Sequence, residues 1–87
     1  MTDADLEALV KRTLYSVAPD LEGEPIDPEA SFRDQFEIDS MDFLNFIIGL
    51  NKATGIEIPE KDYPKLQSLA ATVAYLHARK TAAMRSG

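Results

Sequence analysis

Apolar residues recur with the spacing of an α-helix in three separate stretches of this chain, and this period limits the possible folds more than any other feature. From Leu6 to Val17 the stripe follows i, i+3, i+4, i+7, i+8 and i+11, which is typical of a helix packed on one face. The alternating segment 56–58 resembles a strand, but the sequence offers no second strand to pair with it. We therefore predict an all-α fold, a small bundle of three main helices plus one short helix, at residues 3–17, 40–53, 59–65 and 68–83.

A long first loop separates the first two main helices. Residues 18–39 show no sustained period and contain three prolines and one glycine, which favour turns. Phe32 and Phe36 are four residues apart, so they fit one short helical turn within this loop. The chain of 87 residues is long enough for one small core, and we predict a single domain covering residues 1–87.

The composition excludes several kinds of site. The chain has no cysteine and one histidine, His77, so it lacks a thiol nucleophile and the usual ligands of a zinc site, and we expect no metal. It contains no apolar run long enough to span a membrane and no basic segment before an apolar one at its start. We therefore expect a cytoplasmic protein that does not insert into membranes.

The charge is distributed unevenly along the chain. The net charge is −6, but residues 20–42 alone contain nine acids and a single base, Arg33. An acidic balance argues against nucleic acid as a partner and favours proteins with basic surfaces. We expect the chain itself to be a monomer.

The second main helix is apolar on nearly every side. Its apolar residues are Met41, Phe43, Leu44, Phe46, Ile47, Ile48 and Leu50. Such a helix is either buried all round or uses part of its surface to bind something. Burial on all sides is difficult in a domain of this size, so the pattern indicates a binding surface.

The pair Asp39-Ser40 lies at the start of this helix. A serine at that place has its hydroxyl beside unpaired backbone N–H groups and the positive end of the helix dipole, which favours a phosphate ester. Without a neighbouring base the serine is a poor nucleophile, so a separate enzyme would have to modify it. The alternative is that Ser40 or Asp39 only caps the helix, because both residue types are common N-caps.

The segment from Ser31 to Leu76 resembles the acyl carrier protein family. Its matching features, in order, are Phe36, the sequence Asp39-Ser40-Met41-Asp42, an apolar helix, Gly55-Ile56-Glu57-Ile58-Pro59, and Ser68-Leu69 at the start of a helix containing Val73, Tyr75 and Leu76. The leading helix and the long first loop also fit the plan of the family, so the resemblance extends over nearly the whole chain.

The resemblance implies a covalent prosthetic group. Ser40 would carry a 4′-phosphopantetheine arm, installed from coenzyme A by a phosphopantetheinyl transferase, and Asp39 would flank it. The thiol of the arm would hold acyl intermediates as thioesters and present them to acyl-loading and acyl-using enzymes with basic docking surfaces. The chain would be a carrier protein and not an enzyme, in a fatty-acid, polyketide-like or other specialised pathway.

The resemblance also implies roles for positions along the second helix. The positions for partner recognition would be Met41, Asp42, Leu44 and Ile48. The positions that shelter an acyl chain would be Phe43, Phe46, Ile47 and Leu50, although each of these four taken singly is more simply a core residue.

One departure from the family suggests a specialised rather than a housekeeping member. Carriers of fatty-acid synthesis usually have several glutamates on the exposed face of this helix, where this chain has Asn45, Asn51 and Lys52. Charge complementarity governs partner choice, so we expect the acidic contacts to come from the first loop instead. Two alternatives remain, an unmodified carrier-like helical binding module that docks through its apolar second helix and, much weaker, a small enzyme that uses Ser40 with His77.

Overall fold

A computed structural model of the chain describes residues 2–36 and 38–86, with side chains as far as Lys80. Glu37, in the predicted loop, and the two end residues of the predicted domain lie outside this description. The elements are α1 (Asp3–Val17), η1 (Pro19–Leu21), α2 (Phe32–Gln35), α3 (Ser40–Thr54), η2 (Glu60–Leu66) and α4 (Leu69–Ser86), where η denotes a 3₁₀-helix. The predicted all-α class is confirmed, because the described residues contain helices and no strand.

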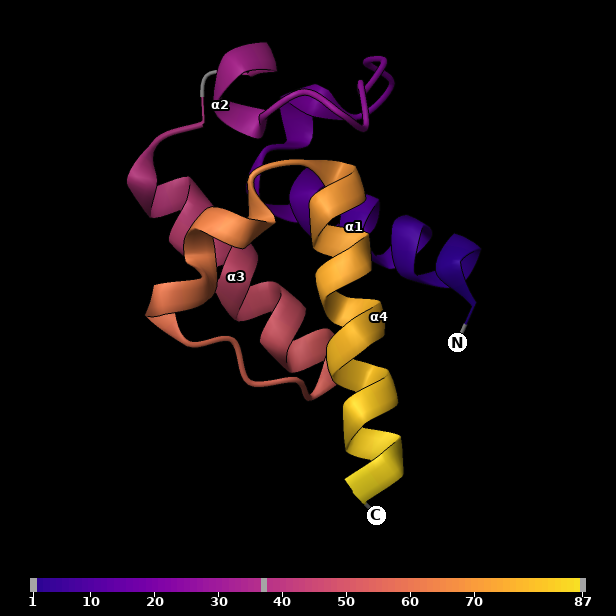
Figure 1. The fold of residues 1–87 in the computed structure, drawn as a ribbon. Helices are drawn as coiled ribbons and strands as arrows, with labels where there is room; N and C mark the ends of the chain where they lie inside the picture. Colours follow the sequence, from indigo (N-terminus) through magenta and orange to yellow (C-terminus); the bar gives the residue numbers. More distant parts are fainter. Residues whose placement is uncertain (1, 37, 87) are drawn as a thin grey trace.

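The three long helices pack around one apolar core. Helix α1 contacts both α3 and α4, and η2 lies against α4, in front of α3 in Figure 1. The buried apolar residues are Leu6, Val10, Leu14, Phe32, Ile38, Phe46, Ile47, Leu50, Ile58, Leu66, Leu69 and Leu76. Each such side chain contributes roughly 1.5–3 kcal/mol through its removal from water. Within the described residues, no helix is both long and apolar enough to cross a membrane.

Helix α1 has the predicted bounds, residues 3–17. Its start is fixed by a capping box, in which the Asp5 N–H donates to the Thr2 hydroxyl at 3.2 Å and the Thr2 N–H donates to the Asp5 carboxylate at 3.1 Å. Leu6, Val10 and Leu14 are fully buried along the face that the sequence pattern predicted.

The first loop is held to the beginning of α4 by two backbone hydrogen bonds. The Phe32 N–H donates to the Gln67 carbonyl at 2.7 Å, and the Ala70 N–H donates to the Pro28 carbonyl at 2.9 Å. Helix α2 is the short turn expected around Phe32 and Phe36. The 3₁₀-turn η1 was not predicted; it starts at Pro19, whose fixed φ suits the first position of a helical turn.

The short third helix differs from the predicted α-helix at 59–65. It is the 3₁₀-helix η2 over Glu60–Leu66, and Pro59 lies just outside it as the N-cap. Pro64 lies within η2, lacks an N–H and restricts the residue before it, so a regular α-helix cannot form here. The bond of 2.9 Å from the Asp62 N–H to the Pro59 carbonyl shows the tighter i to i+3 pattern.

The bounds of α3 and α4 differ slightly from the predicted 40–53 and 68–83. Helix α3 includes Thr54 and ends at Gly55, whose φ of 72° is the left-handed conformation expected of a glycine C-cap. Helix α4 runs over Leu69–Ser86, and Ser68 caps it from outside, because its hydroxyl accepts the Ala71 N–H at 3.2 Å.

Candidate functional site

The sequence left open whether Asp39 or Ser40 caps α3. In the structure Asp39 is the cap, and Ser40 is left for another role. Asp39 is the N-cap of α3, since its carboxylate accepts the Asp42 N–H at 2.8 Å and its carbonyl accepts the Phe43 N–H at 3.0 Å. Ser40 is the first residue of α3 and is exposed. Its hydroxyl is therefore not used as the cap and faces solvent at the positive end of the helix.

The Ser40 hydroxyl has one basic partner that the sequence analysis did not assign. Nη2 of Arg33 donates a hydrogen bond to Oγ of Ser40 at 3.1 Å. Arg33 lies on α2, where Ser31 caps the turn and Phe32 points inward, 2% exposed, with its ring 5.5 Å from the Phe46 ring in an edge-to-face contact. Burial of Phe32 directs the next residue, Arg33, outward toward the start of α3. The signal in the sequence was that Arg33 is the single base among residues 20–42.

A cleft of about 330 Å³ opens beside Ser40, between α3 and η2. This hollow is named here the Ser40 cleft. It is lined by Arg33, Ser40, Phe43, Leu44, Glu60, Tyr63, Pro64 and Gln67. Phe43 and Tyr63 meet edge to face across it, with ring centroids 6.0 Å apart. The cleft thus combines aromatic walls with a cationic group at the Ser40 end.

The predicted recognition positions lie on the outer surface of α3. Met41 is 67% exposed, Leu44 is 39% exposed and Ile48 is 42% exposed. Asp42 is half-buried beside them. Large apolar side chains exposed together on one helix suit contact with another protein, and their role in recognition stays a prediction.

The four predicted acyl-pocket residues are not all in one environment. Phe46, Ile47 and Leu50 are buried in the main core, as the simpler interpretation of each expected. Phe43 is half-buried and lines the Ser40 cleft. The structure therefore places only Phe43 of the four beside Ser40, and an acyl-binding role for the other three stays a prediction.

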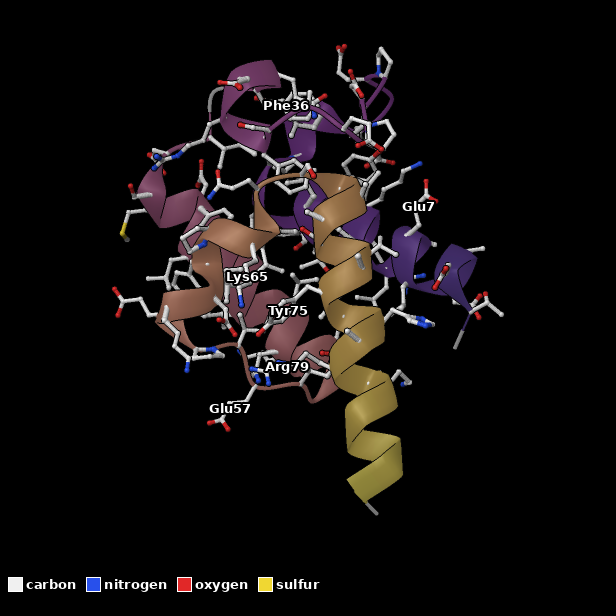
Figure 2. All side chains as sticks on the ribbon, in the orientation of Figure 1. Glu7, Phe36, Glu57, Lys65, Tyr75 and Arg79 are labelled. Atoms are coloured by element: carbon white, nitrogen blue, oxygen red, sulfur yellow. The ribbon has the colours of Figure 1, made fainter. Side chains whose placement is uncertain are left out.

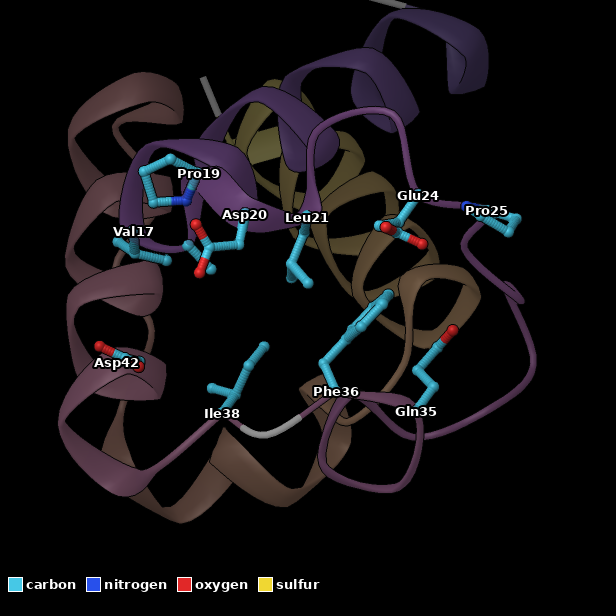
Figure 3. A pocket seen from close by; sticks show the side chains of 11 residues that line it. Val17, Pro19, Asp20, Leu21, Glu24, Pro25, Gln35, Phe36, Ile38 and Asp42 are labelled. Carbon is cyan, nitrogen blue, oxygen red and sulfur yellow. The ribbon is translucent and has the colours of Figure 1, made fainter.

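A second hollow, the acidic pocket, lies on the other side of the α3 start and measures about 620 Å³. It is lined by Val17, Ala18, Pro19, Asp20, Leu21, Glu24, Pro25, Gln35, Phe36, Ile38 and Asp42. Figure 3 shows Leu21 and Phe36 pointing toward each other across it, with Asp20 and Asp42 on the side of α1 and α3. The lining combines apolar side chains with the carboxylates of Asp20, Glu24 and Asp42, so the pocket suits a side chain with an aliphatic stem and a cationic end.

A polar cluster between η2 and α4 was missed by the sequence analysis, which named Tyr75 only as a residue of the last helix. Lys65, Tyr75 and Arg79, which are labelled in Figure 2, all contact the buried Asp62. Oδ2 of Asp62 accepts the Tyr75 hydroxyl at 2.7 Å and Nη2 of Arg79 at 3.3 Å, and Nζ of Lys65 lies 3.4 Å from Oδ1. The Tyr75 hydrogen bond outweighs burial and, with Lys65 and Arg79, lowers the pKa of Asp62. This cluster attaches η2, one wall of the Ser40 cleft, to α4.

His77 and Ser40 have different partners. Nδ1 of His77 lies 2.9 Å from Oδ1 of Asp3 on α1, whereas the Ser40 hydroxyl contacts Arg33. In the part of the chain that the structure describes, these residues form no nucleophile–base pair, and the weak enzyme hypothesis has no geometric support.

Sequence comparisons with known proteins found a matching family profile and several relatives. The sequence profile of the family described as "Phosphopantetheine attachment site" matches residues 5–76. An acyl carrier protein of Rubrobacter xylanophilus is 39% identical over 57 residues, which cover 66% of this chain and 70% of that protein. An acyl carrier protein of Helicobacter hepaticus is 31% identical over 55 residues, covering 63% of this chain and 72% of the relative. A mitochondrial acyl carrier protein of Dictyostelium discoideum is 32% identical over 60 residues, covering 69% of this chain and 49% of the relative.

Proposed function

The chain belongs to the acyl carrier protein family, whose members are carriers with a covalent 4′-phosphopantetheine and not enzymes, and we propose that Ser40 is the attachment residue. The observation that carries the proposal is the exposed Ser40 hydroxyl at the first residue of α3, beside a cap that Asp39 already supplies. The thiol at the end of the arm then holds acyl groups as thioesters. The chain itself has no cysteine, so the arm supplies the thiol that this chemistry needs.

The residues around Ser40 suit a phosphate-bearing arm. The Asp39 carboxylate accepts the Asp42 N–H. The Ser40 and Met41 N–H groups have no acceptor among the described residues and are available to a phosphate oxygen. In the transfer, the Ser40 oxygen bonds to the phosphorus that bears pantetheine, and the pyrophosphate bond of coenzyme A breaks. The adenosine bisphosphate leaves, and the hydroxyl proton passes to a base on the phosphopantetheinyl transferase.

We further propose that the enzymes that load and use the acyl group dock on the exposed side of α3 through basic surfaces. Met41, Leu44 and Ile48 supply the apolar contacts, and Asp42 is an acid beside them. Such a surface favours basic proteins over nucleic acid or the membrane interior, and the carrier works as a cytoplasmic monomer in this proposal.

The acidic pocket supports a specialised rather than a housekeeping role. Helix α3 has no acid after Asp42, whereas Asp20 and Glu24 of the first loop line the pocket with Asp42 (Figure 3). A partner suited to this carrier therefore places a basic side chain toward the first loop.

In this proposal the acyl chain enters from the Ser40 cleft and meets Phe43 first. Phe46, Ile47 and Leu50 lie deeper and are closely packed, so an acyl chain reaches them only if α3 and its neighbours move apart. Short acyl groups are then held near Phe43 and Tyr63 at the surface.

Intact-mass measurement after incubation with coenzyme A and a broad-specificity phosphopantetheinyl transferase tests the attachment. We expect the mass of one phosphopantetheine to be added to the wild type and to Ser16→Ala, which removes an exposed serine of α1. Ser40→Ala should gain nothing. No gain by the wild type with any transferase would instead favour the unmodified binding module, whose docking surface is the same exposed set of Met41, Leu44 and Ile48.

A further inference from the structure

We propose that Arg33 is a positioning residue for the arm, holding the Ser40 hydroxyl before modification and binding the phosphodiester afterwards. This inference rests on the proposed attachment at Ser40 and adds a binding group for the phosphate. It assigns a function to the single base of the acidic segment 20–42.

The hydrogen bond between the two side chains has the direction that this role requires. The Arg33 guanidinium donates to Oγ of Ser40 at 3.1 Å, so the hydroxyl accepts and keeps its own proton for a base on the transferase. Oγ is also the atom that becomes bonded to phosphorus. The free phosphate oxygens are then two bonds from an atom that Arg33 already contacts, within reach of the other N–H groups of the guanidinium.

The charges around Ser40 explain why a cation is needed there. Asp39 precedes Ser40 and Asp42 follows it by two residues, so a phosphodiester at Ser40 adds a third negative charge to this helix end. Arg33 offsets this repulsion, and its planar group can bind two phosphate oxygens at once. Among the described residues, no carboxylate forms an ion pair with Arg33, so its donors remain available.

The backbone around Arg33 is held in place before any ligand binds. Phe32 is buried against Phe46, and its N–H donates to the Gln67 carbonyl at 2.7 Å. Arg33 and Gln67 both line the Ser40 cleft. The guanidinium therefore starts from a fixed point at the mouth of the cleft, which reduces the entropy lost when it binds the phosphate.

Phosphorus NMR of the loaded protein tests this contact directly, because the phosphodiester resonance reports its surroundings independently of acyl transfer. The variants are Arg33→Ala, Arg33→Lys, which keeps the charge without the planar fork, and Arg12→Ala, which removes a charge from the exposed side of α1. We expect Arg33→Ala to shift the resonance, Arg33→Lys to shift it partly, and Arg12→Ala to match the wild type. The shift between wild type and Arg33→Ala should shrink in high salt, because the pair is exposed.

Loading kinetics give a second measurement on the same variants. We expect kcat/KM for phosphopantetheine transfer to fall about three- to fivefold in Arg33→Ala, as for the loss of one exposed charge contact. The melting temperature of Arg33→Ala should equal that of Arg12→Ala. A slower transfer in Arg33→Ala would then reflect lost positioning of the arm and not a less stable fold.

The outcomes distinguish the two proposals. If Arg33→Ala loads at the wild-type rate and its phosphorus resonance is unchanged, the role of Arg33 is refuted while attachment at Ser40 stands. Equal shifts in Arg33→Ala and Arg12→Ala would also refute it, since a general charge effect then suffices. If the wild type gains no mass, attachment at Ser40 itself is wrong and the role of Arg33 falls with it.

Discussion

The Tyr75 hydroxyl on α4 donates a hydrogen bond of 2.7 Å to the buried Asp62 carboxylate on η2. The two residues are 13 positions apart in the sequence, and their contact joins the two helices. Arg79 strengthens the arrangement, since its Nε donates to the same hydroxyl at 3.0 Å and its guanidinium carbon lies 5.3 Å from the centre of the Tyr75 ring. The 3₁₀-helix that closes one side of the Ser40 cleft is thus linked to α4 by a buried carboxylate, in addition to the buried Leu66.

Acid should weaken this attachment. A carboxyl group whose pKa is lowered by folding adds stability above its unfolded pKa of about 3.9, and this is lost as the pH falls through the lower folded value. The pKa of Asp62 is lowered, first by Tyr75. We expect Tyr75→Phe to reduce the melting temperature at pH 7 and the difference from wild type to shrink below about pH 4.

Thermal unfolding followed by circular dichroism between pH 7 and pH 3 measures this effect. Tyr15→Phe is the control, because the Tyr15 hydroxyl forms no hydrogen bond within the described part of the chain. A deficit of Tyr75→Phe that is the same at pH 7 and pH 3 would show that the contact does not depend on the Asp62 charge.

Two substitutions at Asp39 separate helix capping from partner recognition. Asp39→Ala removes the acceptor of the Asp42 N–H and should lower the free energy of unfolding by about 1 kcal/mol. Asp39→Asn keeps an acceptor oxygen and should be nearly as stable as the wild type. Urea unfolding measures both, and the rate of phosphopantetheine transfer to the Asn variant then reports the charge alone. A wild-type rate for Asp39→Asn would leave Asp39 with a capping role only.

Gly49 of α3 lies close to Thr13 of α1. A Cβ added at Gly49 would lie 2.7 Å from Cγ2 of Thr13, and Thr13 is held by the 2.8 Å bond from its hydroxyl to the Leu9 carbonyl. We expect overpacking in Gly49→Ala to cost about 1–3 kcal/mol, which cancels or outweighs the roughly 1 kcal/mol that alanine gains in a helix. Adding Thr13→Ser, which deletes that methyl group, should restore stability in urea unfolding. A Gly49→Ala protein more stable than the wild type would contradict the close approach.

The outer and inner sides of α3 should respond differently to truncation. Leu44→Ala and Met41→Ala should change the free energy of unfolding by less than about 1 kcal/mol, because both side chains are exposed. Phe46→Ala should cost about 3–5 kcal/mol, because that ring is buried against Phe32. Urea unfolding gives the comparison, and kcat/KM with the transferase should fall for Leu44→Ala. Losses of similar size at Leu44 and Phe46 would place Leu44 in the core.

Local signals in the sequence were sufficient to predict the main helices. A regular apolar stripe and a cap define α1, and Gly55 ends α3 as a left-handed glycine. The kind of helix at 60–66 was predicted wrongly although its cause is local, because Pro64 lacks a backbone donor and restricts the residue before it.

The side chains of α3 show where periodicity fails. With apolar residues on nearly every side, spacing alone does not separate the exposed Met41 from the buried Phe46, and the resemblance to a family supplied that distinction. The contacts of Arg33 with Ser40 and of Tyr75 with Asp62 join residues seven and 13 apart on different elements. No local pattern encodes such pairs, because they depend on how the elements pack.

The hydrogen bond from the Phe32 N–H to the Gln67 carbonyl has a mechanical consequence for the two sides of the cleft. It connects the turn that bears Arg33 to the residue that follows η2. Phe32 is also packed against Phe46 of α3, so this turn joins the two sides of the cleft and resists a displacement of η2 away from α3. An acyl group that widens the cleft must therefore strain the same turn that positions Arg33 beside Ser40.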